Sequence, residues 1–312
     1  MKKNKSLYRG LLQGMVAFFI TLTASAQTDM DAIMMNRNQF CNGFLYNYSS
    51  WDHYWEGTLK RNNENLGTVS SQSVMYMANY GITDDLNIMA GIPYVWTKAS
   101  AGTLHGLNGI QDLSVFAKWR FLKKNTGKHR LSVFGIAGIS TPSSDYVADF
   151  LPLSIGLHST NLMVRGMADY QYKRFTVTGS ATYVVRSNIT IDRSSYYDTE
   201  LRLTNEVNMP NAAQYQLRTG YRGRYLLAEA HITNWTTLGG FDITRNNMPF
   251  PSNRMNATQV GASFKYTLKS HTNLSFLAGG QYTIAGRNMG QSLALNGGAF
   301  YAFYFGKQKP KK

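Results

Sequence analysis

Apolar and polar residues alternate with a period of two along two neighbouring runs of the chain, residues 86–97 and 112–121. This period is that of a β-strand whose two faces meet different surroundings. In the second run the apolar face carries Trp119, whereas the opposite face carries the charged side chains of Lys118 and Arg120. An apolar face rich in aromatic residues, opposite a charged face, is typical of a transmembrane β-barrel with lipid outside and a polar lumen inside.

The same alternation continues along the chain and predicts about twelve strands. Their expected ranges are 40–55, 69–82, 86–98, 109–122, 130–141, 161–172, 175–187, 212–222, 225–236, 255–268, 274–286 and 293–305. The connections after the even-numbered strands are tight turns, and those after the odd-numbered strands are mostly longer. Short periplasmic turns and longer extracellular loops alternate in this way in outer-membrane barrels. We therefore predict an all-β fold, a transmembrane antiparallel up-and-down β-barrel, over residues 39–306.

Four short motifs in this part of the chain resemble a known family. They are Tyr-Gly-Ile-Thr-Asp-Asp-Leu at 80–86, Gly-Ile-Pro-Tyr at 91–94, Gly-Ile-Gln-Asp-Leu at 109–113 and Lys-Trp-Arg-Phe at 118–121. In this order they resemble bacterial outer-membrane proteins grouped under a MetA pathway of phenol degradation. The resemblance implies a porin-like barrel of a Gram-negative outer membrane that transports a hydrophobic or aromatic compound.

The N-terminus has the features of a secretory signal peptide. Basic residues precede an apolar run over residues 11–23, and Ala24-Ser25-Ala26 provides a cleavage site. The apolar run is too short for a spanning helix, which argues against a retained membrane anchor. We therefore expect a signal peptide over 1–26 and export of the mature chain. Residues 27–38 then precede the first strand, either in the periplasm or folded into the barrel mouth as a plug.

Charge and cysteine content exclude several other kinds of function. The formal net charge is +15, part of which lies in the signal peptide and in a basic C-terminal tail at 307–312. The chain has no cluster of Lys and Arg on a helix and no nucleic-acid recognition motif, so we predict no nucleic-acid partner. Cys41 is the one cysteine and cannot form an internal disulfide. No metal-ligand spacing occurs, and we predict no cofactor.

The last predicted strand indicates how the chain reaches its membrane. Residues 297–305 are rich in Phe and Tyr and resemble the terminal signal of outer-membrane barrels, although a basic tail follows them. We therefore expect the barrel assembly machinery, the lipid bilayer of the outer membrane and a small solute to be the partners of this protein.

The polar face of the strands supplies the candidate solute pathway. Its titratable lumen residues are predicted to be Asp112, Lys118, Arg120, Arg165, Asp169, Arg186, Arg218, Arg222, Glu229, His231 and Lys265. Two interpretations stay open: ion pairs that rigidify a narrow lumen, or a ladder that guides an anionic solute. In the second interpretation Arg165, Arg186 and Arg218 bias passage towards anions.

Two other classes of function are weighed against a channel. His158 and Ser159 are neighbours, but no serine-hydrolase motif surrounds them, so an enzyme is not predicted. The polar loops over 188–211 and 238–253 contain Tyr and Phe side chains that either bind a partner or pack over the barrel mouth. The sequence thus predicts an outer-membrane channel for a small solute by passive or facilitated diffusion. The alternative is a non-conducting barrel whose loops bind a ligand.

Overall fold

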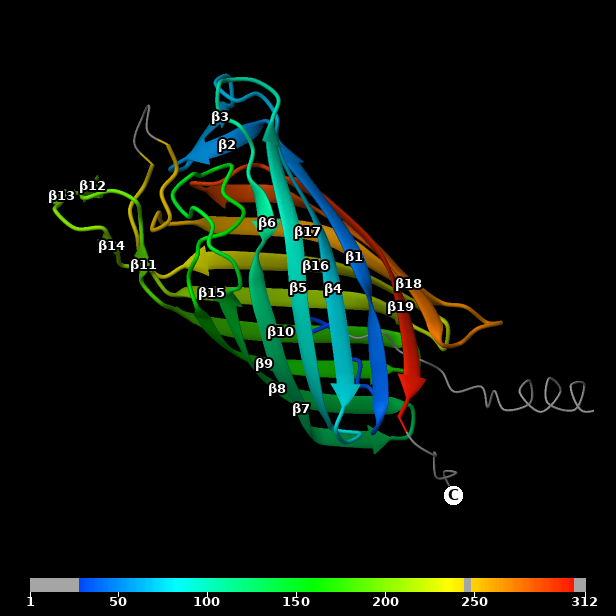
Figure 1. Ribbon diagram of the computed structural model, residues 1–312. Coiled ribbons are helices and arrows are strands. Elements are labelled where there is room, and N and C mark those ends of the chain that lie inside the picture. The colour runs from blue at the N-terminus through cyan, green and yellow to red at the C-terminus, as the bar shows by residue number, and fades with distance from the viewer. Residues whose placement is uncertain (1–27, 244–247, 306–312) are drawn as a thin grey trace, which may run out of the picture.

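Twelve long antiparallel strands close into a barrel within residues 28–243 and 248–305, the parts of the chain that the computed structural model describes (Figure 1). The barrel strands are β1 (Gln39–Trp51), β4 (Val69–Gly81), β5 (Leu86–Ala99), β7 (Asp112–Thr126), β8 (His129–Pro142), β9 (Asn161–Tyr172), β10 (Phe175–Arg186), β15 (Ala212–Arg222), β16 (Leu226–Thr237), β17 (Asn256–Thr267), β18 (Leu274–Arg287) and β19 (Leu293–Tyr304). Each pairs with its neighbours in sequence, β1 pairs with β19, and the pairing of β1 with β4 and of β4 with β5 completes the ring. The sheet therefore has no free edge along the barrel wall.

The predicted strands are confirmed, with small differences at their ends. The sixth and eighth predicted ranges coincide with β9 and β15. The first prediction ran too far, because the chain leaves the barrel after Trp51. Residues beyond it form a separate hairpin of β2 (His53–Glu56) and β3 (Leu59–Asn62). The fourth was predicted to begin at residue 109, but β6 (Asn108–Ile110) is a short strand on β5, and β7 begins only at Asp112.

The outer surface of the barrel is apolar, as expected for contact with lipid. Exposed aliphatic side chains include Val115, Val164, Leu217 and Ile232. Exposed aromatic side chains gather towards both ends of the strands: Tyr172, Phe175, Tyr221, Tyr266 and Phe276 at one end, and Tyr94, Tyr183, Tyr215 and Tyr282 at the other. An apolar band between two aromatic girdles is characteristic of outer-membrane barrels. No helix long and apolar enough to cross a membrane occurs in the part of the chain that the structure describes.

The two ends of the barrel differ in the length of their connections. At the short-turn end lie the turns β4–β5, β7–β8, β9–β10, β15–β16 and β17–β18 together with residues 28–38. At the long-loop end the connections carry β2, β3, β6 and the two-residue strands β11 (Ile189–Thr190), β12 (Tyr196–Tyr197), β13 (Leu201–Arg202) and β14 (Glu206–Val207). Figure 1 shows these small elements gathered at one end of the barrel. The predicted signal peptide and the basic tail at 307–312 lie outside the described residues.

Candidate solute pathway

The alternation of the strands places all eleven predicted lumen residues on the face opposite the lipid-facing side chains. Lys118, Arg165, Asp169, Arg218, Glu229 and Lys265 are buried, and Asp112, Arg120, Arg186, Arg222 and His231 are partly buried. On β7, for example, Lys118 is inaccessible to solvent while its neighbour Trp119 is 56% exposed. A charge on the lipid face would cost roughly 2 to 4 kcal/mol near the membrane midplane, which explains why the charges share the inner face.

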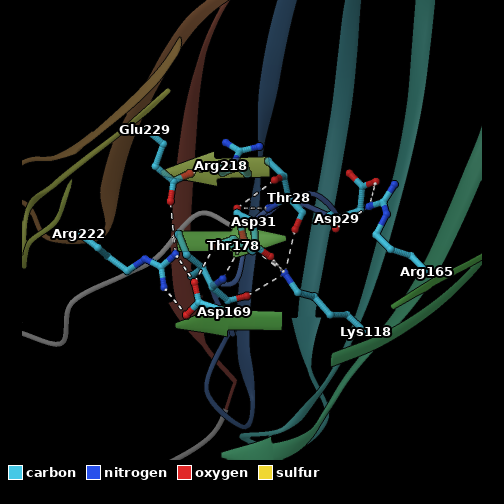
Figure 2. A network of polar contacts seen from close by, with 11 residues as sticks. Thr28, Asp29, Asp31, Lys118, Arg165, Asp169, Thr178, Arg218, Arg222 and Glu229 are labelled. Carbon is cyan, nitrogen blue, oxygen red and sulfur yellow. Dashed lines mark hydrogen bonds and ion pairs between the residues drawn. The ribbon is translucent and has the colours of Figure 1, made fainter. Parts of the chain in front are cut away.

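Four charged side chains from β9, β15 and β16 form one network on the inner wall (Figure 2). The Asp169 carboxylate accepts hydrogen bonds from both terminal nitrogens of Arg222, at 3.0 and 3.2 Å, and from the Thr178 hydroxyl at 2.7 Å. Glu229 accepts from Arg222 at 3.3 Å and from Arg218 Nε at 2.9 Å. These charges neutralise one another, which satisfies the requirement that buried charges be paired.

A second set of contacts joins the inner wall to the chain before β1. We call residues 28–38 the N-terminal segment. The Lys118 ammonium donates hydrogen bonds to the backbone carbonyls of Thr28 and Ile33, both at 3.1 Å, to the carbonyl of Asp31, and to the Asp31 carboxylate at 3.3 Å. Both side chains of this ion pair are nearly inaccessible to solvent. Lys118 thereby holds a whole turn of the N-terminal segment inside the barrel.

The N-terminal segment also touches opposite sides of the barrel. Near its start, Asp29 accepts two hydrogen bonds from Arg165 of β9, one on its carboxylate at 3.0 Å and one on its carbonyl at 2.8 Å. Near its end, Met35 is fully buried in a cluster that includes Phe300 of β19. Strands β9 and β19 lie six strands apart in either direction round the barrel. The segment therefore crosses the bore from one wall to the other.

The end of the N-terminal segment fits closely against β4. The amide of Asn38 donates to the carbonyl of Gly81 at 2.7 Å, and Asn36 donates to the Tyr304 hydroxyl at 2.9 Å. A Cβ atom at Gly81 would lie 2.0 Å from the carbonyl oxygen of Asn36, closer than any side chain tolerates. The glycine thus lets the segment lie directly on the strand where it enters the barrel.

Three further predicted lumen residues lie near the two ends of the barrel. Arg120 donates to Asp85 at the short-turn end, with Nε 2.7 Å from the carboxylate. Asp112 accepts a hydrogen bond from the Tyr146 hydroxyl, and Arg186 donates to the carbonyl of Pro210 at 3.3 Å, both at the long-loop end. His231 lies midway along β16, beside Gly261 of the neighbouring β17. The charged lumen residues therefore form separate groups along the barrel axis.

The long loops pack together, which is one of the two possibilities that the sequence left open for their Tyr and Phe side chains. Seven buried residues form a hydrophobic cluster from three different loops: Ala148, Ile189, Ile191, Tyr196, Val207, Met209 and Phe250. Tyr196 and Phe250 stack with their ring centroids 5.2 Å apart, and Phe241 packs against the same cluster, whereas Tyr197 is 62% exposed.

One long loop, residues 143–160, also reaches along the rim to the ends of β4 and β5. Its Leu153 is fully buried with Leu66 and Val69, and the Leu153 carbonyl accepts a hydrogen bond from Thr97 of β5 at 2.6 Å.

Asp242 anchors the loop over residues 238–253 to the end of β18, because its carboxylate accepts a hydrogen bond from Arg287 at 2.8 Å. That hydrogen bond holds the pKa of Asp242 below its usual value, so the carboxylate is charged at neutral pH.

Sequence reasoning missed the two acidic residues that complete the lumen, Asp29 and Asp31. A signal for them was present, since two carboxylates immediately precede a barrel whose inner wall was predicted to be basic. Their partners Lys118 and Arg165 are, however, 87 and 136 residues away, so no local pattern identifies the pairs.

Similar proteins were found by fold and by family. An outer membrane channel from Pseudomonas putida F1 is 13% identical, has a TM-score of 0.71, and is matched over 90% of this chain and 100% of its own. The translocator domain of the autotransporter NalP from Neisseria meningitidis is 11% identical, with a TM-score of 0.46 over 88% of this chain and 90% of its own. No curated protein sequence matches this chain significantly. At these identities the first similarity shows a shared fold.

The sequence itself matches one family model, described as "Putative MetA-pathway of phenol degradation", over residues 68–297. This match extends from the start of β4 into β19 and includes all four motifs noted above. It covers well over half of the chain, and the fold agrees with it. The chain therefore belongs to this family and is an outer-membrane β-barrel.

Proposed function

We propose that this protein is an outer-membrane channel that passes small solutes by passive or facilitated diffusion and that the N-terminal segment closes it. The observation that carries the proposal is the crossing of the bore by a segment that belongs to no barrel strand. Barrels of eight strands are filled by their own side chains, and barrels of sixteen to eighteen leave an open aqueous channel. In this barrel of intermediate size the N-terminal segment occupies the bore, and it is removable without breaking the wall because it belongs to no barrel strand.

The orientation follows from the connections. Short turns face the periplasm and longer loops face the outside in barrels of this kind. The N-terminal segment then enters from the periplasmic side, which agrees with a mature chain that begins there after removal of a signal peptide at 1–26. In this orientation a solute meets the packed loops first and the N-terminal segment last.

A catalytic role finds no support at His158 and Ser159, the neighbours that the sequence singled out. The Ser159 hydroxyl donates to the backbone carbonyl of Ser187 at 2.7 Å, and the His158 ring lies beside Asp145, with Nε2 3.8 Å from its carboxylate. A hydroxyl that donates to a carbonyl is not activated by a base. We propose that the protein acts without covalent chemistry.

A second candidate function rests on the loop cluster around Tyr196 and Phe250. Loops that bury apolar side chains among themselves present a defined surface to the outside, as a barrel that binds a ligand without conducting would require. Pro210, Leu238 and Phe241 line a cavity of about 400 Å³ in these loops.

Transport through reconstituted protein separates the two candidates. We expect liposomes containing the purified barrel to swell in small sugars or amino acids, and planar bilayers to show discrete conductance steps. Removal of residues 27–36 should increase both signals, since it removes the closing segment and leaves β1 intact. Liposomes that stay impermeable with both the full-length and the truncated protein would exclude the channel and leave the loop-binding function.

Arg186 is the side chain that we expect to bias passage towards anions. Of the three arginines considered for this role, Arg165 pairs with Asp29 and Arg218 pairs with Glu229, so their charges are neutralised. The guanidinium of Arg186 donates to the Pro210 carbonyl near the outer mouth. Arg186→Gln should therefore shift the reversal potential in a KCl gradient towards lower anion preference. An equal shift in Lys60→Gln, an exposed residue of β3 on the outer hairpin, would assign the effect to surface charge in general.

A further inference from the structure

A cavity of about 410 Å³ lies at the short-turn end, between the N-terminal segment and the inner wall of the barrel. Its walls come from β7, β8, β9, β15, β16 and β17, and from Ala32, Ile33, Met34 and Asn36 of the segment. Sites for small organic molecules commonly have volumes of about 300 to 1,000 Å³. The cavity is therefore large enough for a compact solute.

The charges around this cavity are almost all positive. Its lining includes one acidic side chain, Asp84, and six basic ones: Arg120, Lys123, Arg130, Arg222, Arg224 and Lys265. Arg120 pairs with Asp85, and Arg222 pairs with Asp169 and Glu229. Arg130 donates to the amide oxygen of Gln171, and Arg224 lies over the Tyr225 ring. A site lined by this excess of basic side chains attracts anions.

Two of these arginines also have an unused hydrogen-bond donor. The Nε atoms of Arg130 and Arg222 are buried, and neither has a hydrogen-bond partner among the described residues. Burying a charged donor without an acceptor is costly, so such groups in native proteins have a reason to be there. Both Nε atoms belong to guanidinium groups whose side chains line the same cavity, so both groups are candidates for holding an oxyanion there.

Part of the remaining lining is apolar. Ile33 and Met34 of the N-terminal segment and Leu227 of β16 all line the cavity. Met34 also packs against the cluster of Ala32 with Phe134, Ile136 and Met167. An inorganic anion gains no free energy from contact with these apolar side chains, whereas an organic anion buries its apolar part against them.

We propose that this cavity is a binding site for a small organic anion, a carboxylate with an apolar body. Arg130 and Arg222 bind the carboxylate, and Ile33, Met34 and Leu227 contact the body. The inference rests on the proposed function, since it names the class of solute that the channel takes. Because the N-terminal segment forms one wall, the site exists only while the segment is inside the barrel.

Calorimetric titration of the purified full-length barrel in detergent tests the site directly. The probe is benzoate, which combines a carboxylate with an apolar ring; benzamide is its neutral counterpart, and inorganic phosphate is an anion without an apolar body. We expect benzoate to bind and the other two to bind at least about tenfold more weakly, the loss expected when a charge-assisted hydrogen bond or the apolar contact is absent.

The variant Arg130→Gln should weaken benzoate binding at least about tenfold, because it removes the charge and the unused donor. Arg130 is preferable to Arg222, whose replacement would leave Asp169 and Glu229 without their partner. Arg174→Gln is the matched control: Arg174 lies at the same end but is exposed and donates to Tyr221 at 2.8 Å. This control should bind benzoate like the parent protein. A difference in electrophoretic migration between heated and unheated samples verifies that both variants are folded.

The site would be overturned if benzoate did not bind, or if benzamide bound as tightly as benzoate. It would also be overturned if Arg130→Gln kept the parent affinity for benzoate, or if Arg174→Gln lost as much affinity as Arg130→Gln. Phosphate binding as tight as that of benzoate would overturn the organic part of the proposal. Conductance without benzoate binding would refute the site and leave the channel, whereas benzoate binding by a protein that neither conducts nor permits swelling would refute the channel and leave the site.

Discussion

Replacement of Lys118 by methionine is expected to release the N-terminal segment and raise the conductance of the barrel. Lys118 donates to two backbone carbonyls, at Thr28 and Ile33, and pairs with the Asp31 carboxylate at 3.3 Å. The methionine keeps the length of the side chain but leaves Asp31 as an unpaired charge in the lumen. Removing one partner of a buried pair costs roughly 3 to 5 kcal/mol. Because about 1.4 kcal/mol changes an equilibrium constant tenfold, the equilibrium between the bound and the released segment shifts at least about a hundredfold towards release.

Two measurements check this release. Single-channel recordings should show a larger conductance for Lys118→Met than for the parent protein, and the amides of residues 28–38 should exchange hydrogen faster. Lys128→Met is the matched control, because Lys128 lies exposed in the β7–β8 turn at the same end of the barrel. Unchanged conductance together with fast amide exchange would show that the segment leaves without opening the bore, which contradicts its role as the closing element.

The substitution Asp169→Asn is expected to cause the largest loss of stability. Asp169 is buried and accepts hydrogen bonds from Thr178 and from both terminal nitrogens of Arg222. An asparagine of the same shape offers one acceptor and turns an amide donor towards a guanidinium. The network then contains a cation that is only partly compensated, and we expect the free energy of unfolding to fall by roughly 3 to 5 kcal/mol.

Urea unfolding of the reconstituted barrel, followed by tryptophan fluorescence, measures this loss. Glu200→Gln provides the comparison, because Glu200 forms an ion pair with Arg202 on an outer loop and both side chains are exposed. Exposed pairs contribute little to stability, so this variant should unfold at the urea concentration of the parent protein. If both variants unfolded alike, the inner network would be no more important than a surface ion pair.

The barrel wall was predictable because its pattern is local. In β9, Leu162 and Val164 face lipid while Arg165 faces the lumen, and the side of each residue follows from its place in a period of two. The length of the connections also follows from the sequence, since tight turns leave little room between two alternating runs. At most of the tight turns the predicted strand bounds were accurate, although β7 extends to Thr126, beyond its predicted end at residue 122.

The prediction was wrong where the pattern changes without a turn. The chain from Trp51 into β2 keeps its aromatic character, so the sequence gives no sign that it leaves the barrel there. For the loop over residues 188–211 the sequence left open whether it binds a partner or packs, and in the structure Ile189, Ile191 and Val207 meet Phe250 from another loop. Such packing depends on segments that are distant in the sequence.

The sequence by itself determined the fold class, the face on which each strand carries its charges, and the family. Only the tertiary structure decided which charges meet: Asp31 with Lys118, Asp29 with Arg165, and Asp169 with Arg222. The structure also places the N-terminal segment inside the barrel, whereas the sequence left open whether it lies in the periplasm or in the barrel mouth. The physical reason is that alternation reports only whether a residue meets lipid or lumen. The partner that a lumen residue meets depends on the closure of twelve strands into a ring, which brings residues from opposite walls within reach of one short segment.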